Sequence, residues 1–105
     1  SSTAMRERIE RARAIQKERF AGQGLFTNSQ MRPRELHRVC KLSHELKAIL
    51  QQAMERLKLS GRAYERILKV TRTIADLDGA EEIALNHLLE AIQYRSLDRQ
   101  GNYPQ

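Results

Sequence analysis

Apolar residues recur every three or four positions in four stretches of the chain, which is the period of an amphipathic helix. These stretches cover residues 4–20, the residues after Ser43, Gly61 to about Leu77, and the residues after Leu85. The apolar positions are, in chain order, Met5, Ile9, Ala12 and Ile15; Leu46, Ile49, Leu50, Ala53 and Leu57; Ala63, Ile67, Val70, Ile74 and Leu77; and Leu88, Leu89 and Ile92. Each set predicts one apolar helix face.

Residues that favour the start or the end of a helix lie at the boundaries of these stretches. Ser43 and Ser60 are good N-caps, and Pro33 suits the first position of a short helix that runs to about Cys40. Asp78-Gly79 ends the third stretch, because glycine readily takes the left-handed conformation of helix ends. Residues 21–31 hold two glycines and small polar residues and predict a loop. No strand-like alternation persists, so we expect an all-α fold, a small helical bundle of four main helices plus one short helix.

Size and composition narrow the class of protein. The chain has 105 residues and a mass of 12.2 kDa, which suits one small domain. No apolar run approaches the roughly 18 residues of a membrane span, and the N-terminus has no signal-peptide pattern. A single cysteine, Cys40, excludes an intrachain disulfide. We therefore expect a cytoplasmic protein that makes no membrane contact.

The net charge of +6 belongs entirely to the first part of the chain. Residues 1–42 hold ten basic and four acidic side chains, whereas residues 43–105 hold nine of each. Such a segment favours a polyanionic partner, and DNA is one candidate. The candidate nucleic-acid-binding residues are Arg6, Arg8, Arg11 and Arg13. The alternative is a solvated helix face, because Glu7 and Glu10 interrupt the basic run.

A line of polar residues on the helix from Gly61 is the most specific chemical feature. Arg62, Arg66 and Lys69 fall at i, i+4 and i+7, with Thr73 four residues further, so they share one face. Arginine binds phosphate oxygens in bidentate fashion, and Arg62 lies in the first helical turn. A solvated face remains the alternative, with Glu65 and Asp76 beside the line as local ion-pair partners.

Other constellations give little support for catalysis or metal binding. One thiolate at Cys40 with scattered imidazoles at His37, His44 and His87 matches no closed zinc spacing, so no metal site is expected. Cys40 reads as a small buried residue rather than a nucleophile. The chain has no phosphate-cradling glycine-lysine loop, so we expect no ATP hydrolysis by this chain alone.

Residues 59–77, with the sequence LSGRAYERILKVTRTIADL, resemble the signature segment of the ComM-type magnesium-chelatase-like AAA+ ATPases. Further similarity follows in order along residues 1–98, in the Arg6-Glu7-Arg8-Ile9 segment, in the segment from Ala12 to Phe20, and in the closing segment from His87 to Asp98. The resemblance implies that residues 1–98 form the helical C-terminal lid domain, including a long N-terminal helix at 4–20. Residues 99–105 would then be a flexible tail.

The resemblance also implies a role in an ATPase. Arg62 matches the sensor 2 arginine, which reaches the γ-phosphate of ATP, and Arg66 is a secondary candidate. Partners would be the AAA+ α/β domain of the same polypeptide and neighbouring subunits of a hexamer, with ATP and Mg²⁺ bound in the intact protein. The lid would couple hydrolysis to subunit movement in a motor that acts on DNA.

Two alternatives stay open at this point. The chain could be a freestanding basic helical module that binds nucleic acid, although no helix rich in Asn, Gln and Arg stands out for base recognition. It could also be an adaptor whose residues 4–20 dock on an acidic groove of a partner.

Overall fold

The computed structural model describes residues 2–99, and side chains are described for residues 2–95. Within these residues the chain forms five α-helices and one short 3₁₀ helix, with no strand. They are α1 (Ser2–Arg19), η1 (Asn28–Gln30), α2 (Pro33–Val39), α3 (His44–Leu57), α4 (Gly61–Leu77) and α5 (Leu85–Arg99). The predicted all-α fold is confirmed, with α2 as the short helix. The first residue of the predicted flexible tail, Arg99, is the last residue of α5. The other tail residues, 100–105, lie outside the described residues.

The helix boundaries follow from local chemistry. Ser43 Oγ accepts a hydrogen bond from the Leu46 N–H at 3.2 Å, and Ser60 Oγ accepts one from the Ala63 N–H at 3.3 Å, so both predicted N-caps are confirmed. Gly79 follows α4 with a φ of +70°, the left-handed conformation expected there. Lys58 ends α3 in the same conformation, which is uncommon for a residue with a Cβ.

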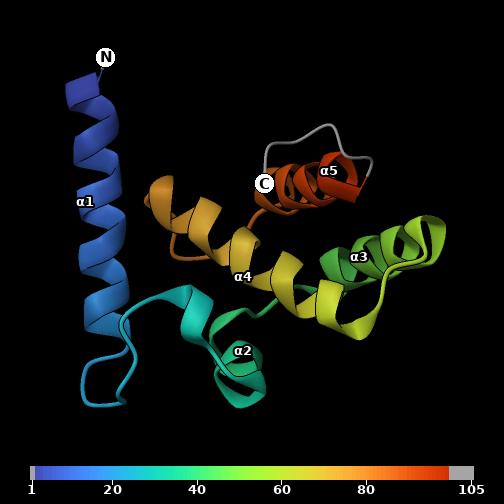
Figure 1. Cartoon of the computed structure of the whole chain (residues 1–105), viewed down its shortest axis with the longest axis horizontal. Coiled ribbons are helices and arrows are strands. Elements are labelled where there is room, and N and C mark those ends of the chain that lie inside the picture. Colours follow the sequence, from blue (N-terminus) through green and yellow to red (C-terminus); the bar gives the residue numbers. More distant parts are fainter. Residues whose placement is uncertain (1, 100–105) are drawn as a thin grey trace.

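Helix α4 lies at the centre of the fold (Figure 1) and packs against α1, η1, α2 and α5. Ala63, Ile67, Leu68 and Ala75 on α4 are buried. Around it the core is completed by side chains of the surrounding helices and loops: Phe20, Met31, Leu36, Cys40, Leu42, Leu46, Leu50, Ala53, Ile83, Leu88, Ala91 and Ile92. Most of the contacts between elements of the fold therefore involve α4.

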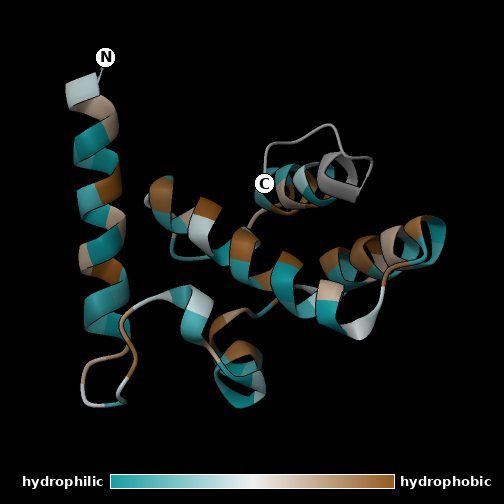
Figure 2. Ribbon diagram, in the orientation of Figure 1, coloured by the Kyte–Doolittle hydropathy of each residue, from teal (hydrophilic) through white to brown (hydrophobic). Residues whose placement is uncertain are grey.

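Helix α1 is attached differently. Only Ala12 and Gln16 of its residues are buried, and its first turns extend past the end of α4 (Figure 1). Met5 is 61% exposed, and Ile9 and Ile15 are also exposed, so the predicted apolar face is covered only at Ala12. Figure 2 shows that hydrophilic residues predominate along α1. The buried contacts that hold α1 to the rest of the domain therefore lie in its C-terminal half.

The start of α5 and the predicted loop at 21–31 each differ from the sequence-based prediction. Leu88 and Ile92 of α5 are buried as a helical face predicts, but Leu89 is 47% exposed because α4 and α3 cover only one side of α5. The predicted loop at 21–31 contains η1, and Asn28 in η1 is 1% exposed.

No helix in the described part of the chain is both long enough and apolar enough to cross a membrane.

Candidate functional site

Arg62 is exposed in the first turn of α4, as predicted. The Ser60 cap and the buried Ala63 fix this turn, so the backbone that carries Arg62 is well anchored on the opposite face. An arginine here lies beside the helix N-terminus, whose partial positive charge adds to the attraction for an anion. The geometry therefore suits phosphate binding from outside the domain.

The structure divides the predicted line of polar residues on α4 into two halves. Lys69 Nζ donates a hydrogen bond to the Ser29 carbonyl at 3.2 Å, and Thr73 Oγ1 accepts one from Asn28 Nδ2 at 3.1 Å. These two residues are thus engaged by η1, whereas Arg62 and Arg66 remain exposed. Arg66 borders a small hollow of about 40 Å³ between α4 and α5. The exposed pair Arg62 and Arg66 is the part of the line that an external ligand can reach.

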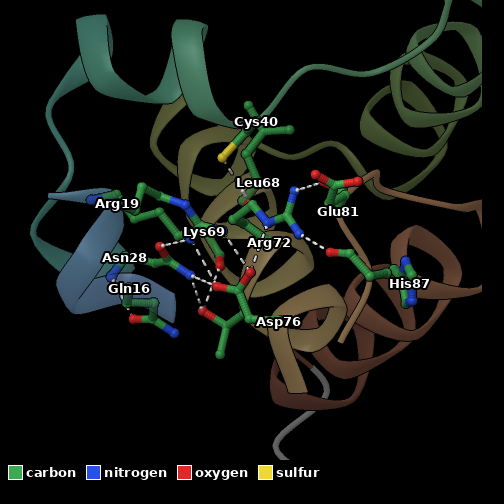
Figure 3. A network of polar contacts seen from close by, with 12 residues as sticks. Gln16, Arg19, Asn28, Cys40, Leu68, Lys69, Arg72, Asp76, Glu81 and His87 are labelled. Carbon is green, nitrogen blue, oxygen red and sulfur yellow. Dashed lines mark hydrogen bonds and ion pairs between the residues drawn. The ribbon is translucent and has the colours of Figure 1, made fainter. Parts of the chain in front are cut away.

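Asp76 is buried within a network of polar contacts (Figure 3). The solvated-face alternative had placed it beside this line as a local ion-pair partner. Arg19 binds both of its oxygens, at 2.7 and 2.8 Å, and Arg72 Nε donates to Oδ1 at 3.1 Å. Asn28 Nδ2 donates to Oδ2 at 2.8 Å. The local ion pair of that alternative is present, between Arg72 and Asp76 on α4, but the solvent exposure was wrong because α1 and η1 cover this side of α4.

The pKa of Asp76 is lowered. Burial by itself would raise it, but the hydrogen bonds from Arg19 and Asn28 and the charges of Arg19 and Arg72 outweigh that effect. The carboxylate therefore stays ionised and joins α1, η1 and α4. Sequence analysis missed this cluster, because Arg19 was counted only among the ten basic side chains of residues 1–42. Its partner Asp76 lies 57 positions further along the chain, beyond the reach of local spacing.

A groove of about 1040 Å³ opens between α2, α3 and the first half of α4. Buried apolar residues such as Leu36, Leu42 and Leu68 form its floor, and Gly61 and Tyr64 line its α4 side. The charged residues along it are Arg38, Lys41, Lys47 and Glu65. Arg62 does not line this groove, although it follows Gly61 directly. The groove is thus apolar at its base and cationic at its rim.

Cys40 lines the same groove but is 5% exposed. Burial raises the pKa of its thiol to about 11, and the thiol donates a long hydrogen bond to the Leu68 carbonyl at 3.7 Å. The interpretation of Cys40 as a packed residue is confirmed. His37 and His44 are exposed, whereas the buried His87 accepts from the Ala84 N–H and contacts Asp78. Among the described residues, no three His, Cys, Asp or Glu side chains could together hold a metal ion.

The four arginines proposed for nucleic-acid contact, Arg6, Arg8, Arg11 and Arg13, are exposed on α1. Helical periodicity places Arg6 and Arg13 on one side of α1 and Arg8 and Arg11 on another, so they do not form one basic face. Arg8 Nε also donates a hydrogen bond to the Leu77 carbonyl at 3.3 Å. Nucleic-acid binding by these residues therefore stays a prediction.

Comparison with known proteins points to one family. The family described as "Magnesium chelatase, subunit ChlI C-terminal" matches residues 1–95. Competence protein ComM of Haemophilus influenzae is 44% identical over 94% of this chain, and protein YifB of Escherichia coli is 39% identical over 94%. YifB of Salmonella typhimurium is 43% identical over 69%. The chain spans only 19% of the length of the first and second of these relatives and 14% of the third.

Proposed function

Since this chain belongs to the C-terminal family of the magnesium chelatase subunit ChlI, we propose that it is the lid domain of a ComM-like AAA+ ATPase. In this proposal Arg62 contacts the γ-phosphate of ATP bound to an α/β domain, and the lid moves when that phosphate leaves. The exposed Arg62 in the first turn of the central helix carries the proposal.

Phosphoryl transfer depends mainly on positioning and on charge stabilisation, which a guanidinium on a rigid helix can supply. Loss of the γ-phosphate removes the interaction that holds Arg62, so the lid changes its position. Because α4 packs against α1, η1, α2 and α5, that change would move the domain as a body. Arg66, one turn further along α4, would give a weaker second contact.

The intact protein would be a cytoplasmic hexamer that uses ATP with Mg²⁺ and acts on DNA. The Haemophilus relative is named competence protein ComM, and this name supports the choice of DNA as the substrate. Mg²⁺ would bind with the nucleotide phosphates at the α/β domain, and this chain would supply the arginine. An immunoblot of source cells should then give a single band several times larger than 12.2 kDa; a band at 12.2 kDa would favour the freestanding nucleic-acid-binding module.

The direct test substitutes Arg62 in the full-length ATPase. We expect Arg62→Ala to lower the ATP turnover number by about tenfold or more, because a charge that acts on the transition state is removed. Arg62→Lys should recover only part of the loss, since an ammonium group cannot bind two phosphate oxygens in the planar geometry of arginine.

Arg56→Ala, which removes an exposed arginine of α3, is the matched control and should leave turnover unchanged. Circular dichroism should show the same helix content for all three variants. Normal turnover in the Arg62→Ala protein would remove Arg62 from the site.

A further inference from the structure

The α4–α5 connection and the start of α5 carry charge of the opposite sign to the rim of the groove. Residues 78–90 contain no lysine or arginine, and their carboxylates are Asp78, Glu81, Glu82 and Glu90. All four of these residues are exposed. The same segment exposes two apolar side chains, Leu85 and Leu89, at 44% and 47%. We call this set of six residues the acidic patch.

Buried contacts hold the acidic patch in one shape. Arg72 donates hydrogen bonds to the backbone carbonyls of Ala80 at 2.6 Å and Glu81 at 2.9 Å. His87 then fixes the start of α5, with Nδ1 accepting from the Ala84 N–H at 2.9 Å and Nε2 lying 3.0 Å from Asp78 Oδ2. A preorganised surface loses less conformational entropy on binding than a mobile loop does.

The groove described above complements this patch in two ways. Its rim carries Arg38, Lys41 and Lys47 against one carboxylate, Glu65, and its floor is apolar. The groove begins at Gly61, the first residue of α4, whereas the acidic patch begins just after Leu77, the last. A helix of 17 residues is about 25 Å long. The groove and residues 78–82 of the acidic patch thus lie at opposite ends of the central helix, so these parts cannot pair within one molecule.

From this complementarity we propose that the groove of one copy of this chain binds the acidic patch of a second copy, head to tail. Such a contact uses two different surfaces, so a pair of copies keeps one free groove and one free acidic patch, and association continues beyond a dimer. The contact does not use Arg62, and it stands or falls separately from the ATPase role.

Two variants of the 105-residue chain test the proposal. The groove variant, Lys41→Glu with Lys47→Glu, retains a normal acidic patch. The patch variant combines Glu81→Ser, Glu82→Ser and Leu85→Ser and retains a normal groove. All five residues are exposed, so the fold should survive, and circular dichroism checks this. Arg13→Glu with Lys17→Glu on α1 is the matched control, because it changes the net charge as the groove variant does.

Sedimentation velocity is the measurement. The native chain and the α1 control should form dimers and larger species as concentration rises, less so at 0.5 M salt because exposed charges are screened. Each variant alone should associate at least about tenfold more weakly, since reversed or missing charges oppose docking. An equimolar mixture of the two variants should form a 1:1 dimer that grows no further, because one normal groove meets one normal patch.

Two results would overturn the proposal. A native chain that stays monomeric at every concentration leaves the groove to a partner of another sequence. A mixture that stays monomeric while the native chain associates shows that other surfaces make the contact.

Discussion

At the scale of single residues, the buried carboxylate of Asp76 has the largest structural consequence. It accepts hydrogen bonds from Arg19, Arg72 and Asn28, which come from α1, α4 and η1. Its side chain is fully buried and that of Arg72 is 5% exposed, so water cannot replace a lost partner. A buried ion pair is costly to desolvate, and removing one member leaves the other charged and unpaired.

Asp76→Asn keeps the shape of the side chain but removes the charge that Arg19 and Arg72 share. We expect it to lower the free energy of unfolding by about 3–5 kcal/mol, the usual effect of breaking a buried ion pair. Urea denaturation followed by circular dichroism measures the change. Glu55→Ala, at an exposed site on α3, is the control and should fall within about 0.5 kcal/mol of the native chain. A change of that small size in Asp76→Asn would show that the cluster does not stabilise the fold.

Glu35 gives the stability of the chain a dependence on pH. Hydrogen bonding by the Arg32 guanidinium lowers the pKa of Glu35 to about 2, against the opposing effect of burial, and the Arg32 N–H and Arg34 contribute further. A carboxyl group with a lowered pKa stabilises the folded state above its unfolded pKa, and this contribution is lost as pH falls toward the folded pKa. The lowered pKa of Asp76 acts in the same direction.

The urea midpoint should therefore fall as the pH drops from about 5 toward 2. Glu35→Gln keeps an oxygen that can accept from the Arg32 N–H but does not titrate, so its midpoint should fall less steeply than that of the native chain. Arg34 and Arg32 remain in both proteins, which isolates the effect of the carboxylate. Parallel midpoint curves for the two proteins would contradict this assignment.

At the scale of helices, local patterns predicted most of what the structure shows. The bounds of α4, the short α2 and both serine caps follow from residue spacing, Pro33, Ser43 and Ser60, because these signals act within a few residues of each other. The exposure of Arg62 and Arg66 follows in the same way from the stripe of apolar residues on α4. Short-range chemistry thus predicts the helices and the candidate phosphate-binding residues.

Contacts between distant residues could not be predicted in that way. The burial of Asp76 depends on Arg19 and Asn28, which are 57 and 48 positions away. The exposure of Met5 and Leu89 likewise depends on where neighbouring helices end, which a single helix's periodicity does not encode. The groove needs three helices to be placed relative to each other. Residue spacing predicts the burial or exposure of such positions from their own helix alone, whereas the neighbouring helices decide it.

At the scale of the whole molecule, α4 links every surface with a proposed role. Arg62 lies in its first turn, the groove runs along its first half, and the acidic patch follows its last residue. The Asp76 cluster joins α4 to α1, whose first turns project from the body (Figure 1). A force at Arg62 would then reach α1 through a small number of charged contacts rather than through a broad apolar interface.

This arrangement predicts that α1 can detach without unfolding the rest of the domain. Arg19→Leu removes the ion pair that joins α1 to Asp76, and it should raise the rate of trypsin cleavage at Arg6, Arg8, Arg11 and Arg13 by about tenfold, the effect of about 1.4 kcal/mol on local opening. Cys40, packed among α2 and α4, reports on the core independently, because its thiol reacts only when the core opens.

The rate at which a thiol reagent modifies Cys40 should change by less than about twofold in the Arg19→Leu variant, since local opening of one helix leaves the remaining core closed. Arg34→Leu, at an exposed position on α2, is the matched control and should alter neither rate. If cleavage of α1 and modification of Cys40 accelerate together, then α1 and the core unfold as one unit. In that case the Arg19–Asp76 ion pair would not be what limits a local opening of α1.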